Sequence, residues 1–118
     1  MVIEFLTFLV PVEQEEAWLA REQEVWGTFL ASCDGFVRRE IWRSDPDLSR
    51  RAGDPAERAS ELGDYIDSGV RPVHVAIWWE TLEQWKAVTP ETVASIDAEM
   101  GDLVVPPTMQ TFSMVVQG

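Results

Sequence analysis

The spacing of apolar and polar residues changes along the chain, and each change marks a boundary between a predicted strand and a predicted helix. Residues 2–10, VIEFLTFLV, are apolar, β-branched and aromatic and end at Pro11, which predicts one strand. Over residues 12–32 the apolar side chains recur at intervals of three, four and seven, which predicts an amphipathic helix. Asp34 and Gly35 follow, and glycine favours the left-handed conformation that ends a helix.

Three further apolar segments predict strands. They are FVRREIWR at 36–43, VHVAIWWE at 73–80 and MQTFSMVV at 109–116. The order of elements is therefore β-α-β-β-α-β, once the helices between the third and fourth strands are included.

Two start signals define those last helices. Thr81 opens the sequence TLEQ, a capping box in which the Gln84 side chain can bond back to the Thr81 amide. TPET at 89–92 begins a second helical stretch that we expect to run to about Met100.

Residues 45–71 form a polar segment punctuated by proline and glycine, which we predict to be an insertion between the second and third strands. Asp54 before Pro55 is a good helix start, so a short helix is expected at about 55–66. Its apolar side would consist of Leu62, Tyr65 and Ile66. We expect this side to pack on its own subunit or on a neighbouring one, outside the core.

The element order predicts an α+β chain with the ferredoxin-like plan, a four-stranded antiparallel sheet with helices on one face. A sheet with one wet face should be apolar on one side only. Two strands break this rule: the first offers Ile3, Phe5 and Leu9 against Leu6, Phe8 and Val10, and the third offers Val73, Val75, Ile77 and Trp79 against Ala76 and Trp78. The helices can cover one face, so a second subunit is expected on the other, giving a homodimer.

Composition and charge narrow the possible partners. A chain of 118 residues with 46% hydrophobic and 25% charged residues is typical of one globular domain, here residues 1–118. The net charge of −12 repels phosphate backbones and anionic lipids, so neither nucleic acid nor a membrane is expected as a partner. The single cysteine, Cys33, and the absence of a basic leader before the first apolar run favour a cytoplasmic protein.

Two titratable residues are candidates for chemistry. His74 is the only side chain whose ordinary pKa lies near neutrality, and it is either a proton-transfer group or a strand residue satisfied by a neighbour or solvent. Glu22 falls within the apolar stripe of the first helix, flanked by Trp18 and Trp26 among others. A carboxylate there must be paired, hydrogen-bonded or beside a cavity, unless the helix is rotated and Glu22 reaches solvent.

The remaining charged strand residues and tryptophans have structural explanations. We interpret Glu4, Arg39 and Glu40 as members of cross-strand ion pairs in preference to pocket groups. Trp78 and Trp79 point to opposite faces of their strand, so at most one of them can line a given cavity.

Several short sequences carry a resemblance to a known superfamily. DGF leading into a strand that ends EIW, and IWWETLEQW leading into a helix, resemble the dimeric α+β barrel proteins, which include antibiotic-biosynthesis and haem-degrading monooxygenases. The opening MVIEFL with EVW at 24–26 is most similar to a small family of uncharacterised proteins in that superfamily. The resemblance covers the chain outside residues 45–71. It implies a ligand cavity between helices and sheet and a dimer formed by two sheets meeting face to face.

The resemblance does not extend to the haem-binding residues. Haem-degrading relatives use an asparagine on the first strand, where this chain has Glu4 and Thr7. Their helical tryptophan falls near Val88, with Trp85 one turn earlier, and their axial histidine lies in a last helix that has no histidine here. We therefore expect no haem, no other cofactor and no metal.

Two functions stay open at this point. One is a cofactor-independent monooxygenase that positions a small aromatic substrate and its reactive anion; the other is a non-catalytic ligand-binding or protein-interaction module. The candidate pocket residues are Glu22, His74, Trp78, Trp85 and Trp26.

Overall fold

A computed structural model describes residues 1–44 and 69–118, which build one open antiparallel sheet. The strands are β1 (Val2–Pro11), β2 (Phe36–Arg43), β3 (Val70–Trp79) and β4 (Thr108–Ser113), in the spatial order β2-β3-β1-β4. The two longest strands, β1 and β3, pair at the centre from Val2 opposite Trp79 to Pro11 opposite Val70. The predicted order of strands and helices along the chain and the four-stranded antiparallel sheet are confirmed.

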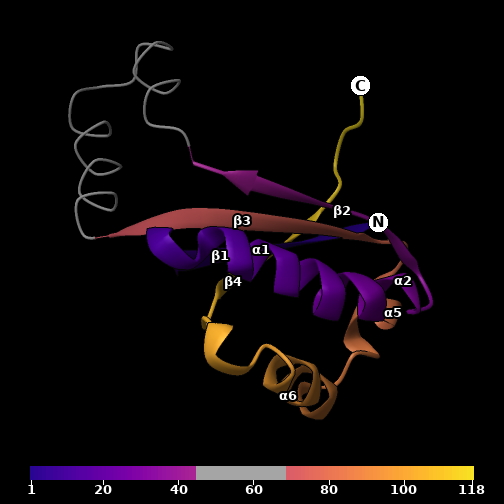
Figure 1. The fold of residues 1–118 in the computed structure, drawn as a ribbon. Helices are drawn as coiled ribbons and strands as arrows, with labels where there is room; N and C mark the ends of the chain where they lie inside the picture. Colours follow the sequence, from indigo (N-terminus) through magenta and orange to yellow (C-terminus); the bar gives the residue numbers. More distant parts are fainter. Residues whose placement is uncertain (45–68) are drawn as a thin grey trace, which may run out of the picture.

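The helices of the described residues lie on one face of this sheet (Figure 1). The first helix is continuous through α1 (Glu15–Glu22), the π-helical turn η2 (Gln23–Gly27) and α2 (Thr28–Ala31), after the short 3₁₀ turn η1 (Val12–Gln14). The others are α5 (Leu82–Lys86), α6 (Pro90–Ala98) and the 3₁₀ turn η3 (Gly101–Leu103). This is the expected ferredoxin-like α+β fold. No helix among the described residues is long and apolar enough to cross a membrane.

The predicted helix boundaries rest on the expected local contacts, with one difference. The Thr81 hydroxyl accepts a hydrogen bond from the Gln84 amide at 3.1 Å, and Thr89 caps α6 in the same way. The Thr81 hydroxyl also donates a hydrogen bond to Oε1 of Gln84 at 3.0 Å, in place of the predicted bond between the Gln84 side chain and the Thr81 amide. Gly35 ends the first helix region with a positive φ of 84°, as expected.

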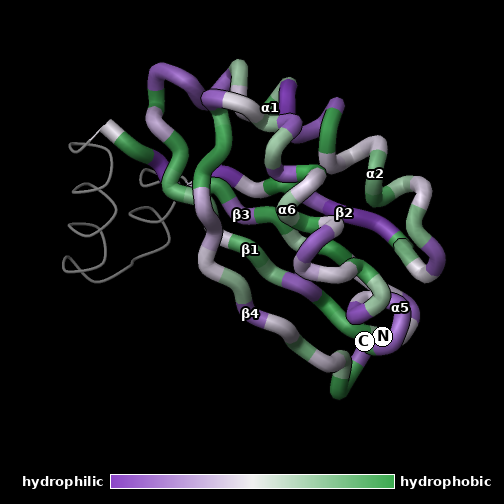
Figure 2. The backbone as a smooth tube through the Cα atoms, turned by 90° about the horizontal axis from the view of Figure 1, so that it is seen from below, coloured by the Kyte–Doolittle hydropathy of each residue, from purple (hydrophilic) through white to green (hydrophobic). Residues whose placement is uncertain are grey.

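The hydrophobic core lies between the sheet and the helices. Strand alternation turns the even-numbered residues of β1 and the odd-numbered residues of β3 toward the helices, where Trp18 and Trp79 are each 1% exposed. Figure 2, which looks onto the helices, shows the hydrophobic stretches of β1 and β3 running beneath them. The other core side chains are Val2, Val10, Leu30, Val73, Val75, Ile77 and Met100.

The opposite face of the sheet is not covered by any helix of the described residues, and it carries an aromatic cluster. Phe5 lies at its centre, with ring centroids 5.9 Å from Trp42, 5.3 Å from His74 and 6.3 Å from Phe112. Trp42 is 44% and Phe112 46% exposed. The prediction that the sheet is apolar on both faces is confirmed.

Two strand boundaries differ from those predicted. β3 begins at Val70, three residues early and inside the predicted insertion, because residues 70–72 continue the ladder with the end of β1. β4 ends at Ser113, where its pairing with Val2 ends, and does not reach residue 116. The predicted helix at 55–66 and its apolar side lie outside the described residues.

Candidate functional site

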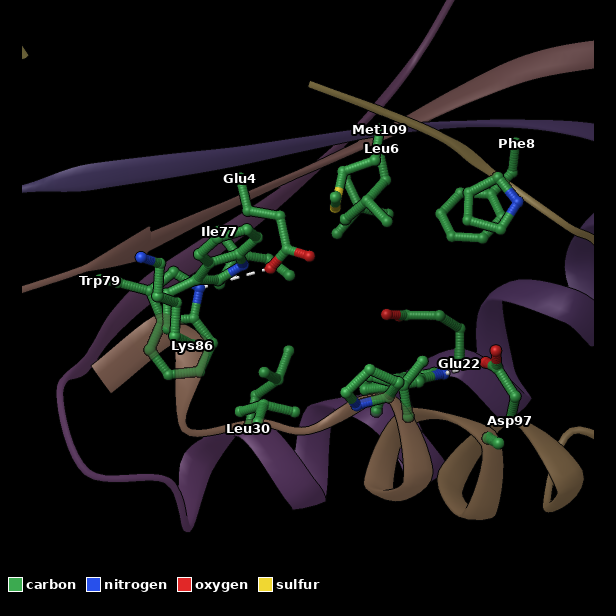
Figure 3. Close-up of a pocket in the computed structure, with 18 residues that line it drawn as sticks. Glu4, Leu6, Phe8, Glu22, Leu30, Ile77, Trp79, Lys86, Asp97 and Met109 are labelled. Carbon is green, nitrogen blue, oxygen red and sulfur yellow. Dashed lines mark hydrogen bonds between the residues drawn. The ribbon is translucent and has the colours of Figure 1, made fainter. Parts of the chain in front are cut away.

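A cavity of about 650 Å³ lies between the sheet and the helices (Figure 3). Strands β1, β3 and β4 form one wall, and the first helix region with α5 and α6 forms the other. Most lining side chains are apolar, namely Leu6, Phe8, Leu30, Val75, Ile77, Val88, Pro90, Val93, Ala94, Pro107 and Met109. An apolar enclosure of this volume is typical of a small-molecule site.

Three carboxylates interrupt the apolar lining: Glu4 from β1, Glu22 from α1 and Asp97 from α6. Tryptophans 26, 79 and 85 line the same cavity. The polar groups of the site therefore come from elements that are far apart in the sequence, and the fold brings them to one place.

Glu4 points into the cavity from the central strand β1 (Figure 3). Its carboxylate accepts a hydrogen bond from the Trp79 indole N–H at 3.3 Å. Burial raises the pKa of Glu4 above its usual value, more than the hydrogen bonds from Trp79 and Trp85 lower it. A carboxylate with a raised pKa is a stronger base than one in water, which suits proton transfer from a bound ligand.

Glu22 reaches from α1 toward the centre of the cavity (Figure 3) and is 3% exposed. Its Oε1 accepts a charged hydrogen bond from the Arg39 guanidinium on β2. Its Oε2 is buried and has no hydrogen-bond partner among the described residues. Of the two predicted placements, the structure shows the inward-facing one.

Glycine at position 27 makes room for the Glu22 partner. A Cβ atom on Gly27 would lie 2.8 Å from the Arg39 Nη2 atom. The guanidinium therefore passes directly against the helix backbone on its way to Glu22. The helix has a π turn at this point, from Gln23 to Gly27, a feature that is frequent at functional sites.

Asp97 lines the cavity from α6 and lies beside Glu22 of the first helix region (Figure 3). Its Oδ1 accepts a hydrogen bond from the Trp26 indole N–H at 3.0 Å, which links α6 to the π turn. Burial raises the pKa of Asp97, and the Trp26 hydrogen bond lowers it by less.

The five residues selected from the sequence divide between the two faces of the sheet. Glu22, Trp26 and Trp85 line the cavity. His74 and Trp78 do not line it, since both lie on the sheet face opposite the described helices.

His74 and Trp78 have their own contacts there. The His74 ring is stacked on Phe5 and lies within hydrogen-bond distance of the Thr7 hydroxyl, 3.0 Å away. Burial lowers the pKa of His74 below its usual value. The Arg38 guanidinium lies 4.2 Å from the Trp78 ring centroid, as a cation–π contact.

Sequence reasoning missed Glu4 and Asp97 as cavity residues. The predicted cross-strand ion pairs of Glu4 and Arg39 are wrong: Glu4 bonds to Trp79, and Arg39 pairs with a helix residue. Glu40 is in an ion pair within its own strand, with its Oε2 atom 3.6 Å from Nη2 of Arg38. A usable signal was present for Glu4, because it shares the helix-facing parity of Leu6 and Phe8.

Within the described ranges, no group of three or more histidine, cysteine or acidic residues is arranged to hold a metal ion. The cavity offers hydrogen-bonding groups and an apolar surface. It can hold an aromatic or otherwise apolar molecule and exchange a proton with it.

No family model matches the chain, and no curated protein matches it at a significant level. Solved structures do. A proposed antibiotic biosynthesis monooxygenase from Bordetella bronchiseptica superposes with a TM-score of 0.64 at 13% identity, covering 98% of this chain and 97% of its own. The haem degrader MhuD from Mycobacterium tuberculosis, which holds two haems in its active site, gives 0.61 at 16% identity over 100% and 99%.

The cofactor-independent oxygenase SnoaB from Streptomyces nogalater superposes with a TM-score of 0.56 at 17% identity, covering 98% of this chain and 94% of its own. These similarities establish that the chain has the ferredoxin-like fold of the antibiotic biosynthesis monooxygenase-like proteins, which confirms the fold implied by the sequence resemblance.

Proposed function

We propose that this protein is a cytoplasmic homodimer that binds a small aromatic molecule in the cavity and oxygenates it without a cofactor. The observation that carries the proposal is an apolar cavity of about 650 Å³ that contains a buried carboxylate, Glu4, with a raised pKa. The fold shared with a cofactor-independent oxygenase supports it.

In this proposal Glu4 is the general base. It removes a proton from a phenolic hydroxyl, and the apolar walls hold the resulting anion away from water. The electron-rich anion reduces dioxygen, one oxygen atom bonds to ring carbon, and the other leaves as water as the ring becomes a quinone. The phenol supplies both the protons and the electrons, so the reaction balances as phenol plus O₂ gives quinone plus water.

A haem-dependent reaction is less well supported by the residues present. The chain has one histidine, His74, and it lies on the other face of the sheet from the cavity. Among the residues that line the cavity, none is a histidine or a cysteine.

The homodimer has separate support. The aromatic cluster of Phe5, Trp42, His74 and Phe112 lies on a face that no helix of the described residues covers. A second copy of the sheet would bury it.

The test is oxygen consumption by the purified protein with 1-naphthol and 1,5-dihydroxynaphthalene, measured with an oxygen electrode and by quinone absorbance. Ala94→Trp would fill the cavity, since Ala94 lines it, and should abolish turnover. Ser95→Trp adds the same side chain at a position of the same helix that does not line the cavity and should not. Glu4→Gln should bind the phenol but consume oxygen at least 100-fold more slowly.

The outcomes separate the two functions. Tight binding that Ala94→Trp removes, with no oxygen consumption by the unmodified protein, would contradict the oxygenase and support the non-catalytic ligand-binding module. Turnover that survives Glu4→Gln would show that another group is the base.

A further inference from the structure

The hydrogen-bond donors and acceptors that line the cavity differ in whether they already have a partner. Among the lining residues, the indole N–H of Trp26 already donates to Asp97, and the indole of Trp79 already donates to Glu4. The Trp85 indole acts on the same Glu4 carboxylate as a weaker donor that lowers its pKa. Lys86 is the cationic residue of the lining, and it is exposed. The indole donors of Trp26 and Trp79 are therefore in use.

One hydrogen-bond acceptor among the lining residues has no donor in the described part of the chain. Glu22 lines the cavity with its carboxyl end turned toward it (Figure 3), and its Oε2 is buried and has no hydrogen-bond partner among the described residues. A buried acceptor without a donor costs about 1–3 kcal/mol, so a bound group that donates to it is stabilised by relieving that cost.

The ion pair with Arg39 determines that a ligand group near Glu22 Oε2 must be a hydrogen-bond donor. The Arg39 guanidinium bonds to Oε1 of Glu22, and an ion-paired carboxylate offers only lone pairs on its second oxygen. The group that meets Oε2 must therefore carry an N–H or O–H. A ligand carboxylate or phosphate would instead face three carboxylates, Glu4, Glu22 and Asp97, while the Trp26 and Trp79 indoles already donate to two of them.

We infer that the cavity selects hydroxy- or amino-substituted aromatic molecules that donate a hydrogen bond to Glu22 Oε2, and that it excludes aromatic acids. The ring lies against the apolar walls, with Leu6, Phe8 and Ile77 on the sheet side and Leu30 on the helix side. Glu22 is the specificity-determining residue. The inference rests on the proposed function in placing an aromatic ligand in this cavity, but it concerns binding and not turnover.

The experiment compares four naphthalene probes of nearly equal size with the unmodified protein, by quenching of tryptophan fluorescence and by calorimetry. They are 2-naphthol, 2-(aminomethyl)naphthalene, 2-methylnaphthalene and 2-naphthoate. The naphthol and the amine should bind about tenfold or more tightly than the methyl compound, and the naphthoate more weakly than it. Equal affinity for all four, as expected if a water molecule satisfies Oε2 in every complex, would overturn the inference.

Glu22→Gln supplies the second arm. The glutamine oxygen can keep the bond to Arg39, which leaves an amide N–H₂ in place of Oε2. The preference should then invert: 2-naphthol should lose about tenfold in affinity, and 2-naphthaldehyde, which can only accept, should gain. Glu24→Gln removes the same charge from an exposed position of the same helix and should leave all affinities within twofold.

Each failure has a separate meaning. If Glu22→Gln does not fold, judged by its near-ultraviolet circular dichroism, the four-probe series with the unmodified chain still decides. If oxygen is not consumed but the probe order holds, the oxygenase is wrong and the selectivity stands. If oxygen is consumed and naphthoate binds as tightly as naphthol, the selectivity is wrong and the oxygenase stands.

Discussion

Glu22 on the first helix and Arg39 on strand β2 form an ion pair in which both side chains are largely buried, 4% and 14% exposed. The pair links the helical layer to the sheet beside the cavity. Glu22 also lines the cavity, and its second oxygen has no hydrogen-bond partner among the described residues, so the same residue makes a structural contact and forms part of the cavity wall.

Removing only the cationic partner should be costly. Arg39→Met leaves the Glu22 carboxylate buried and unpaired, and we expect a loss of about 3–5 kcal/mol in the free energy of unfolding, measured with urea. Arg38→Met, on the same strand but with 60% of the side chain exposed, should cost about 1 kcal/mol or less. The double variant Glu22→Met with Arg39→Met should recover most of the loss; a double variant as unstable as Arg39→Met would show that the charge is not the cause.

Gly27→Ala should weaken the same pair. Alanine is favoured over glycine in a helix by about 1 kcal/mol, but its Cβ would meet the Arg39 guanidinium and displace it from Glu22. We expect a net loss of about 1–2 kcal/mol and a smaller further cost of Arg39→Met in this background. Thr28→Ala, at the exposed next residue, should change stability by less than about 0.5 kcal/mol. Full additivity of Gly27→Ala and Arg39→Met would contradict the proposed displacement.

Glu4 should make stability depend on pH. Its pKa is raised in the folded state, so its contribution is present below the unfolded value of 4.5 and is lost as the pH rises through the folded value. Glu4→Gln keeps an acceptor for Trp79 and removes this dependence. The variant should therefore gain stability relative to the unmodified protein from pH 4 to pH 7, in urea titrations at both values. Glu83→Gln, an exposed residue of α5, controls for the loss of one negative charge; an equal gain there would rule out a local cause.

The aromatic cluster predicts where a dimer would separate. Phe112→Asp places a charge on the uncovered sheet face and should raise the dimer dissociation constant by about 30-fold or more, the equivalent of about 2 kcal/mol. Leu82→Asp changes an equally exposed apolar residue on the helical side and should not. Light scattering after size-exclusion chromatography measures both. A stable monomer of the unmodified protein at micromolar concentration would contradict the dimer.

Haem should not bind tightly. The cavity wall contains no histidine, and the single histidine lies behind the sheet, stacked on Phe5. A titration with haemin should give no Soret shift that saturates at a fixed stoichiometry. Saturation at one or two haems per chain would show that a residue of another type serves as the ligand.

The sequence was a good guide to the elements and a poor guide to the polar contacts of the site. Strands and helices were predictable because their signals are local: the apolar, β-branched and aromatic run of β1 that ends at Pro11, and the Thr81 and Thr89 caps. The bond between Trp26 and Asp97 joins residues 71 positions apart, and no periodicity encodes such a pair.

A helical wheel with a constant rotation per residue describes only part of the first helix. A constant 100° per residue placed Glu22 in the apolar stripe, and Glu22 is indeed buried. The same rotation does not hold from Gln23 to Gly27, because a π turn closes on the fifth residue instead of the fourth. The π turn has no sequence signature that would have shown this.

The π turn also affects how this chain must be compared with others. A helix with one π turn contains one residue more than a regular α-helix joining the same two ends. A homologue with a regular helix would therefore align with a one-residue gap between Gln23 and Gly27. An alignment without that gap would pair either Glu22 or Phe29 with the wrong position, and conservation measured from it would understate whichever residue it displaced.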